Sequence, residues 1–173
     1  VGLLSLCQCV WAIESPSELN TADNNTFFTL YLVRHGEKQT NDKDPDLTEC
    51  GEKRAVQIAA LLDKVKLEKI YSTNYKRTIA TAQPTAVQYK LDITQYNPKD
   101  LSNFAKTLTE NKHTALIVGH SNTTPQLASL LTNSNVNDMS ELEYQRLYQI
   151  QFNNDVPNLV ELTQPVSCEI VHD

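Results

Sequence analysis

The chain has 173 residues, of which 40% are hydrophobic, so it can bury the core of one domain of ordinary size. Its formal net charge of -6 argues against nucleic acid or an anionic membrane as the main partner, because both require a basic surface. The four cysteines have no spacing with histidines that is typical of a zinc site, and folding requires no cofactor. We therefore expect no metal and no cofactor, and any anionic ligand must be held by a local cluster of cations.

The N-terminal segment changes from apolar to polar around Ala12. Residues 1–12 have the length of the apolar region of a signal peptide and are too short to span a bilayer. We predict that they are the remainder of a signal peptide, that residues 13–25 form a linker and that residues 26–173 form the domain. The simpler alternative for residues 1–12 is a frayed apolar tail.

These features predict an exported protein, periplasmic or secreted, with no stable membrane insertion after removal of the signal. A lipoprotein site at Cys7 or Cys9 is a weaker alternative, because the preceding residues Leu6 and Gln8 are not small. Export would permit a disulfide between Cys50 and Cys168, and the sequence leaves that pairing open.

From residue 26 onward, apolar runs typical of strands alternate with segments of helical periodicity. We predict strands near residues 27–34, 69–73, 91–96 and 114–120, and helices near residues 48–62, 75–89, 98–110 and 124–131. Two further strand-like runs, 147–152 and 158–163, flank an Asn/Asp/Pro turn and predict an antiparallel hairpin. The pattern indicates an α/β fold: a three-layer sandwich with a mostly parallel sheet, helices on both faces and the hairpin at an edge.

Three of these strands are followed by polar residues that can take part in catalysis or bind a ligand. Arg34, His35 and Gly36 follow the first strand, residues 72–77 follow the second, and residues 119–122 follow the fourth. In open parallel sheets, ligands bind beyond the carboxyl ends of the strands. We therefore expect one site there, with these candidate residues: catalytic Arg34, His35, Arg77 and His120, and substrate-binding Gly36, Asn41, Ser72, Ser121 and Asn122.

Two arginines and two histidines near helix N-termini are typical of a phosphate-binding site. A neutral imidazole is a nucleophile near pH 7, and a phosphoryl group on its nitrogen passes readily to water. The arginines and a second histidine can neutralise the equatorial oxygens without a metal. His113 and His172 lie away from this edge and are expected to be bystanders.

Four motifs in order resemble the histidine phosphatase superfamily, the phosphoglycerate-mutase-like proteins. They are LVRHGEK, LTECGEKRA, IYSTNYKRTIATA and LIVGHSNT, and they extend from Tyr31 to Leu131. The resemblance implies that His35 is the nucleophile, that Arg34 and Arg77 bind phosphoryl oxygens, and that His120 stabilises the transferring group. The segment SELEYQRLYQIQF is similar to small, often exported members of the superfamily.

The chain departs from the superfamily pattern in the short spacer between Arg77 and His120. The spacer leaves no room for the insertions of the acid phosphatase and phytase branch, and it lacks the stretch with the usual glutamate proton donor. Tyr75 and Thr78 stand where Leu and Ala are common, which we interpret as packing changes. The general acid is therefore left open.

Asp100 is the only carboxylate of this spacer expected near the active edge. It would instead be a capping residue if Asn97 is the N-cap and Pro98 the first residue of the following helix. Glu37, beside the nucleophile, and Glu141 or Glu143, before the hairpin, are the alternative acids.

We interpret the chain as a phosphatase that hydrolyses phosphate monoesters through a phosphohistidine, without a metal. Its substrate would be a phosphorylated small molecule or a phosphoprotein. The alternatives are a mutase-like phosphoryl transfer, which needs a closed pocket, and a phospho-ligand binding module without turnover. The sequence does not determine the natural substrate or the oligomeric state.

Overall fold

The computed structural model describes residues 26–40 and 42–165. The predicted signal and linker segments, Asn41, Cys168 and His172 lie outside these ranges. Ten elements follow one another along the chain: β1 (Phe27–Arg34), α1 (Glu49–Leu61), β2 (Lys69–Ser72), α2 (Lys76–Tyr89), β3 (Ile93–Gln95), α3 (Leu101–Asn111), β4 (Ala115–Gly119), α4 (Thr123–Thr132), β5 (Arg146–Asn153) and β6 (Val156–Thr163).

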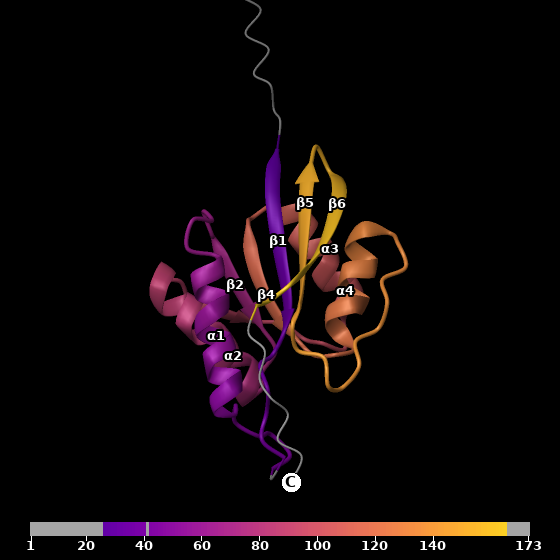
Figure 1. Ribbon diagram of the computed structural model, residues 1–173. Helices are drawn as coiled ribbons and strands as arrows, with labels where there is room; N and C mark the ends of the chain where they lie inside the picture. The colour runs from indigo at the N-terminus through magenta and orange to yellow at the C-terminus, as the bar shows by residue number, and fades with distance from the viewer. Residues whose placement is uncertain (1–25, 41, 166–173) are drawn as a thin grey trace, which may run out of the picture.

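The six strands form one mixed sheet in the order β3-β2-β4-β1-β5-β6. The neighbours β3, β2, β4 and β1 are parallel, whereas β5 pairs antiparallel with both β1 and β6. The C-terminal hairpin therefore lies at one edge of the sheet, as Figure 1 shows. This arrangement confirms the predicted mostly parallel sheet with an added hairpin.

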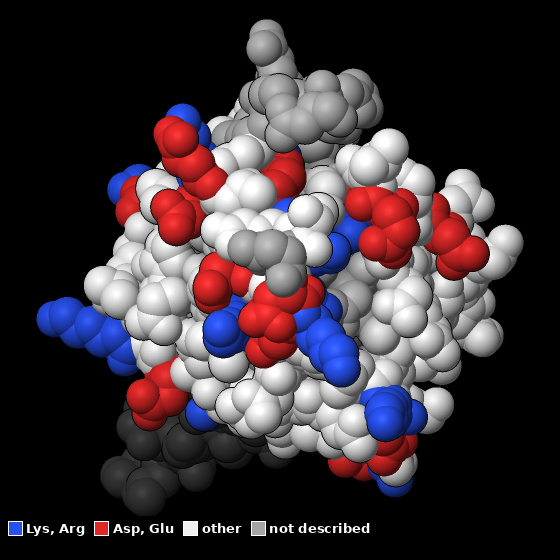
Figure 2. All heavy atoms as spheres, turned by 90° about the horizontal axis from the view of Figure 1, so that it is seen from below, with Lys and Arg blue, Asp and Glu red and all other residues white. Residues whose placement is uncertain are grey.

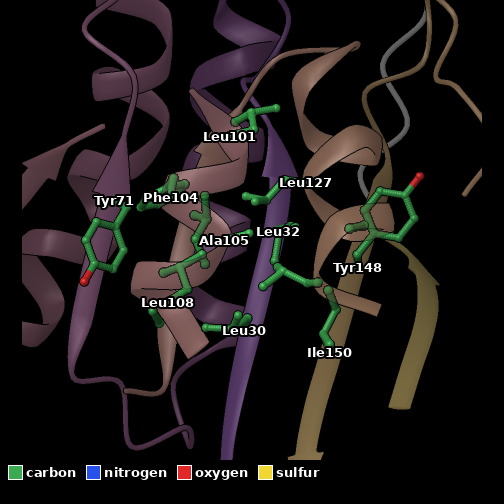
Figure 3. Packing of buried hydrophobic residues seen from close by; sticks show 14 of the residues in the cluster. Leu30, Leu32, Tyr71, Leu101, Phe104, Ala105, Leu108, Leu127, Tyr148 and Ile150 are labelled. Carbon is green, nitrogen blue, oxygen red and sulfur yellow. The ribbon is translucent and has the colours of Figure 1, made fainter. Parts of the chain in front are cut away.

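Two pairs of helices cover the two faces of the sheet (Figure 1). On one face, Ile58 of α1 and Ala82 of α2 pack with Val33 and Ile70 of the sheet. On the other face, α3 and α4 contribute Leu101, Phe104, Ala105, Leu108 and Leu127 to a cluster with Leu30, Leu32, Tyr148 and Ile150 (Figure 3). Each face of the sheet therefore has its own hydrophobic core.

The burial of β4 explains why its sequence is apolar throughout. All five residues of the ALIVG strand are buried, since β4 has strands on both edges and helices on both faces. A central parallel strand of this kind cannot place a polar side chain on either face. Polar residues can follow it only after its carboxyl end, where His120 is found.

Helix α1 packs very closely against the loop that follows β1. Thr48 is its N-cap, as predicted, and the Thr48 hydroxyl accepts a hydrogen bond from the Gly51 N–H. A Cβ atom on Gly51 would lie 2.2 Å from the Glu37 carbonyl oxygen, and one on Gly36 would lie 2.7 Å from the Gly51 carbonyl oxygen. Two glycines therefore allow the helix to contact the backbone beside His35.

The predicted start of α3 is wrong by three residues. The helix begins at Leu101, and its N-cap is Asp100, whose side chain makes no capping hydrogen bond. Residues 97–100 instead form a turn, because the Asn97 side chain accepts from the Lys99 N–H and the Asn97 carbonyl accepts from the Asp100 N–H. The proposed capping role of Asp100 at a third helical position is thus not observed.

Within the described ranges, no helix has the length and hydrophobicity needed to cross a bilayer. Cys50, in the first turn of α1, is disulfide-bonded. Cys168, the partner considered above, lies outside the described ranges.

Candidate active site

The predicted catalytic residues line one cavity of about 360 Å³ at the carboxyl ends of the parallel strands. Figure 2 views this end of the molecule, where basic and acidic side chains lie close together near the middle of the face. The lining residues are Arg34, His35, Lys38, Tyr75, Arg77, Pro98, Lys99, His120, Ser121, Asn122, Thr123 and Glu141. The convergence predicted from the strand ends is therefore present in the structure.

A larger hollow of about 880 Å³ lies by the amino end of β1, around Phe27, Phe28 and Phe152. None of the residues that line it is titratable, whereas the smaller cavity contains four cations and two imidazoles. The smaller cavity is therefore the better candidate for the active site.

His35 follows directly from β1, where its position depends on pairing with β4. Arg34 is in register with Gly119, and the His35 N–H donates to the Gly119 carbonyl at 3.0 Å. The His35 Nδ1 lies 2.7 Å from the Gly36 carbonyl oxygen. Because a carbonyl can only accept, Nδ1 carries the proton and the Nε2 lone pair is available.

Burial keeps the His35 imidazole neutral. The side chain is 2% exposed. Burial, with a smaller contribution from the positive charges of Arg34 and Arg77, lowers the pKa of His35 to about 3. At neutral pH the residue is therefore an unprotonated imidazole in a cationic pocket.

Arg34 is 1% exposed and holds the loop before β5. Its Nη1 donates to the carbonyl oxygens of Ser140, Glu141 and Glu143 at 2.9–3.0 Å. Its Nη2 lies 3.2 Å from Glu141 Oε2, and its guanidinium lies 4.0 Å from the centre of the Tyr144 ring. These contacts fix the guanidinium beside His35.

Arg77, at the start of α2, approaches the same cavity from the other side. Its Nη1 lies 3.3 Å from Asp44 Oδ1, and its Nη2 lies 3.5 Å from His120 Nδ1. The guanidinium also packs over the Tyr75 ring at 4.5 Å. Tyr75 thus has a contact role at the site, beyond the packing change that the sequence suggested.

Both arginines keep a buried donor without a hydrogen-bond partner. The Nε atoms of Arg34 and Arg77 are buried, and neither donates to any group in the described ranges. An unsatisfied buried donor costs about 1–3 kcal/mol. These two Nε atoms have no surface open to the cavity, so the charges of the two arginines, which line it, are what is available to an oxyanion.

His120 is oriented by a chain of buried hydroxyls. Its Nε2 lies 2.9 Å from Thr73 Oγ1, which lies 3.0 Å from Thr78 Oγ1. Thr78 Oγ1 donates to the carbonyl oxygens of Thr73 and Tyr75, at 2.8 and 2.9 Å.

Because carbonyls only accept, the Thr78 hydroxyl must donate to them and accept from Thr73. The Thr73 oxygen then accepts from His120 Nε2–H, which leaves the lone pair on Nδ1. Burial and the charges of Arg77 and Arg34 lower the pKa of His120 to about 4, so the ring is neutral at neutral pH.

Glu37, an alternative acid, is neutralised by Arg54 of α1. The Arg54 Nε lies 2.9 Å from Glu37 Oε2, and Nη2 lies 2.5 Å from Oε1. Arg54 is 1% exposed and Glu37 is 19% exposed, so this is a partly buried two-point ion pair. Glu37 therefore anchors the loop after His35 and does not line the cavity.

The other predicted residues divide into two groups. Ser121 and Asn122 line the cavity, as expected. Ser72 is buried, with its hydroxyl donating to the Thr73 carbonyl, and the Gly36 N–H donates to Thr81, so neither is free to bind substrate through these groups. Asn41 lies outside the described ranges.

Of the four candidate acids, the structure brings only Glu141 to the cavity. Asp100 is exposed and accepts a hydrogen bond from Asn103. Glu143 forms an ion pair with Arg146 at 2.6 Å. Glu141 accepts from the Ser121 hydroxyl at 2.5 Å and faces Arg34.

Sequence reasoning did not identify Lys38, Lys99 or Thr123 as cavity residues, or Asp44 and Tyr144 as partners of the arginines. Lys38 could have been suggested by its position three residues after His35. Thr123 ends the LIVGHSNT motif and begins α4, whereas Lys99, Asp44 and Tyr144 come from loops without a distinctive pattern. In residues 26–40 and 42–165, no group of three His, Cys, Asp or Glu side chains is arranged to hold a metal ion.

Comparison with known proteins agrees with this geometry. Residues 30–97 match the family model of the histidine phosphatase superfamily (branch 1). Over 71 residues the chain is 39% identical to phosphoserine phosphatase 1 of Hydrogenobacter thermophilus, a match that covers 37% of this chain and 34% of that protein. The match thus spans about a third of the relative's length. The resemblance predicted from the four motifs is confirmed.

Solved structures share the fold at low sequence identity. The alpha-ribazole phosphatase of Shigella flexneri has a TM-score of 0.65 and 16% identity, covering 82% of this chain and 100% of its own. The protein histidine phosphatase SixA complexed with tungstate has a TM-score of 0.64 and 14% identity, covering 79% and 97%. A mycobacterial glucosyl-3-phosphoglycerate phosphatase has a TM-score of 0.63 and 14% identity, covering 82% and 100%. These likenesses establish the fold.

Proposed function

We propose that this chain, whose residues 30–97 belong to the histidine phosphatase superfamily, hydrolyses phosphate monoesters through a phosphohistidine on His35, without a metal. The observation that carries the proposal is the placement of a neutral His35, with Nε2 unprotonated, in one cavity with Arg34, Arg77 and His120. A nucleophile and two oxyanion donors are what phosphoryl transfer requires.

In the first step, the Nε2 lone pair of His35 attacks phosphorus and the ester oxygen leaves with the bonding electrons. Arg34 and Arg77 neutralise the charge on the equatorial oxygens. The bound dianion raises the pKa of His120, and the ring, protonated from solvent, then adds an N–H donor at Nδ1. The Nδ1–H bond to the Gly36 carbonyl stabilises the positive charge that develops on the His35 ring. Water then attacks phosphorus, and the electron pair returns to Nε2.

The substrate class we propose is a phosphorylated small molecule or a phosphoprotein. A cavity of about 360 Å³ is large enough for a phosphoryl group and a small leaving group. Lys38 and Lys99 add positive charge to its lining beyond that of the two arginines.

The proposal is tested by phosphate release from a panel of phosphate esters with the whole chain. His35→Ala should abolish turnover and retain part of the phosphate binding, while His113→Ala, a histidine outside the cavity, serves as the control. Quenching under non-acidic conditions should trap an acid-labile phosphoenzyme that His35→Ala cannot form. Orthovanadate should inhibit more strongly than phosphate, because it adopts the five-coordinate geometry of the transition state.

Chelators should leave the rate unchanged if cationic side chains alone neutralise the phosphoryl oxygens. Full activity in His35→Ala would contradict the mechanism. Isomerised phosphate esters in place of free phosphate would indicate a mutase. Phosphate binding without turnover of any ester would indicate a binding module.

We also propose that the protein is exported. The disulfide at Cys50 supports this, since disulfides persist mainly in oxidising compartments. Mass spectrometry of the protein from its native host should find an N-terminus near Ile13 and no free thiol at Cys50. A reduced Cys50 on a chain that retains residues 1–12 would contradict export.

A further inference from the structure

We propose that Glu141 is the proton donor to the leaving group and the base that activates water in the second step. The proposal rests on the phosphatase function proposed above. Its basis is position: among the described residues that line the cavity, Glu141 is the only carboxylate.

The carboxylate of Glu141 is held at the cavity by two groups. Its Oε2 lies 3.2 Å from Arg34 Nη2, and its Oε1 accepts from the Ser121 hydroxyl at 2.5 Å. The backbone of the same residue accepts from Arg34 Nη1 at 3.0 Å. Arg34 and Ser121 therefore orient this acid on the side of the cavity formed by β1 and the start of α4.

The side chain also has the freedom that a proton donor needs. It is 75% exposed, whereas its partner Arg34 is 1% exposed. The carboxylate can therefore move when a phosphoryl group takes its place on the guanidinium, while the backbone of the loop stays fixed to Arg34.

Each of the other candidate carboxylates interacts with a side chain outside the cavity or with another charged group. Glu37 is paired with Arg54, Glu143 with Arg146, and Asp100 faces Asn103. Asp44 accepts from the Lys76 N–H and faces Arg77, but it does not line the cavity. None of these four residues lines the cavity, whereas Glu141 does.

Over one catalytic cycle, Glu141 gives up one proton and regains one. As the N–P bond forms at His35 Nε2 and the P–O bond breaks, the leaving oxygen takes the proton of the Glu141 carboxyl group. In the second step, water forms the new O–P bond, its proton goes to the Glu141 carboxylate, and the N–P electron pair returns to Nε2. One ester and one water give one alcohol and one phosphate, and Glu141 ends protonated.

Substrate binding provides the proton affinity that this role requires. The Ser121 hydroxyl and the charges of Arg34 and Lys38 lower the pKa of Glu141. A phosphoryl dianion on Arg34 removes one of these stabilising charges and places like charge nearby, and both changes favour the protonated carboxyl group. The site therefore takes up a proton when it is filled.

The test compares Glu141→Gln with the unmodified chain on two substrates of the same charge. Para-nitrophenyl phosphate has a leaving group that needs no proton, whereas glycerol phosphate has one that does. We expect kcat/KM for glycerol phosphate to fall by about a hundredfold or more, with a much smaller fall for para-nitrophenyl phosphate. Glu110→Gln, the same change on α3 outside the cavity, should alter neither rate.

Equal losses on both substrates would overturn the proposal, as would a gain on both, which would mean that Glu141 merely competes with phosphate for Arg34. A selective loss in Glu143→Gln or Asp100→Asn, with Glu141→Gln unaffected, would also overturn it.

The two proposals fail differently. If the unmodified chain turns over both esters and is phosphorylated at His35, but Glu141→Gln shows no selective loss, only the role of Glu141 is rejected. If the unmodified chain neither releases phosphate nor becomes phosphorylated, both proposals are rejected.

Discussion

The rings of His35 and His120 lie 5.5 Å apart, centroid to centroid, at an interplanar angle of 69°. This relationship follows from the parallel register of β1 and β4, in which Arg34 is paired with Gly119, so that the next residue on each strand is a histidine. His35 is buried and His120 is partly buried, both near two guanidinium groups, which favours their neutral forms.

The first prediction concerns the protonation of these two histidines. Burial and the nearby arginines lower the pKa values of His35 and His120 to about 3 and about 4, so both rings should stay neutral well below the pH at which an exposed histidine titrates. An NMR titration should show no protonation shift of either ring between neutral pH and about pH 5. The same signals in urea-unfolded protein should titrate near pH 6.5. A folded-state midpoint near that value would contradict the prediction.

A second prediction concerns stability. The unfolded chain binds protons at His35 and His120 below about pH 6.5, whereas the folded chain does not until about pH 4 for His120 and about pH 3 for His35. Their contribution to the free energy of unfolding is therefore fully present above pH 6.5 and is lost as the pH falls toward 3. Urea midpoints should fall with acidification in this window, and the slope should be smaller in His35→Gln. Equal slopes would contradict the assignment to His35.

The third prediction concerns Thr78, which orients His120 through Thr73. Nitrogen NMR should find the neutral His120 with its proton on Nε2. Thr78→Val removes the acceptor of the Thr73 hydroxyl, which can then donate to Nε2, so the proton should move to Nδ1. Turnover should fall by about tenfold, equivalent to one lost hydrogen bond of ~1.4 kcal/mol. Thr78→Ser keeps the hydroxyl and should restore both the tautomer and the rate, whereas an unchanged tautomer in Thr78→Val would exclude the relay.

The fourth prediction concerns the ion pair between Arg54 and Glu37. Arg54→Met leaves the Glu37 carboxylate without its main cation and should lower the free energy of unfolding by about 3–5 kcal/mol. Because Glu37 belongs to the loop that follows His35, kcat should fall as well. The double variant Glu37→Gln with Arg54→Met should recover part of the stability, measured by urea unfolding. Lys53→Ala, beside it on the exposed face of α1, should change stability by less than about 1 kcal/mol.

The sequence alone was sufficient to predict the convergence of the four central residues. Arg34, His35, Arg77 and His120 follow strands or open helices of an α/β alternation, and the carboxyl ends of parallel strands must meet at one edge. The hydrophobic periodicities that define these elements are local. For this reason the strand order did not have to be known for the site to be located.

Side-chain direction within the loops required the tertiary structure. Ser72 follows the same rule of placement as Arg77, yet it is buried and points its hydroxyl at the Thr73 carbonyl. Asp100 was expected near the active edge, but the turn at residues 97–100 delays the helix and leaves its side chain exposed. These outcomes depend on hydrogen bonds at the end of β2 and in the turn before α3, which hydrophobic periodicity does not predict.

Which candidate acid lies at the cavity could be seen only from contacts between distant parts of the chain. The sequence placed Asp100 near the active edge, with Glu37, Glu141 and Glu143 as alternatives. In the structure Arg54 binds Glu37 from 17 residues away, whereas Arg34 and Ser121 hold Glu141 from 107 and 20 residues away. Local propensity determines which elements form and where they end. Long-range packing determines which charged groups meet, because the charge of a side chain is satisfied by whichever partner the fold brings within a few ångströms.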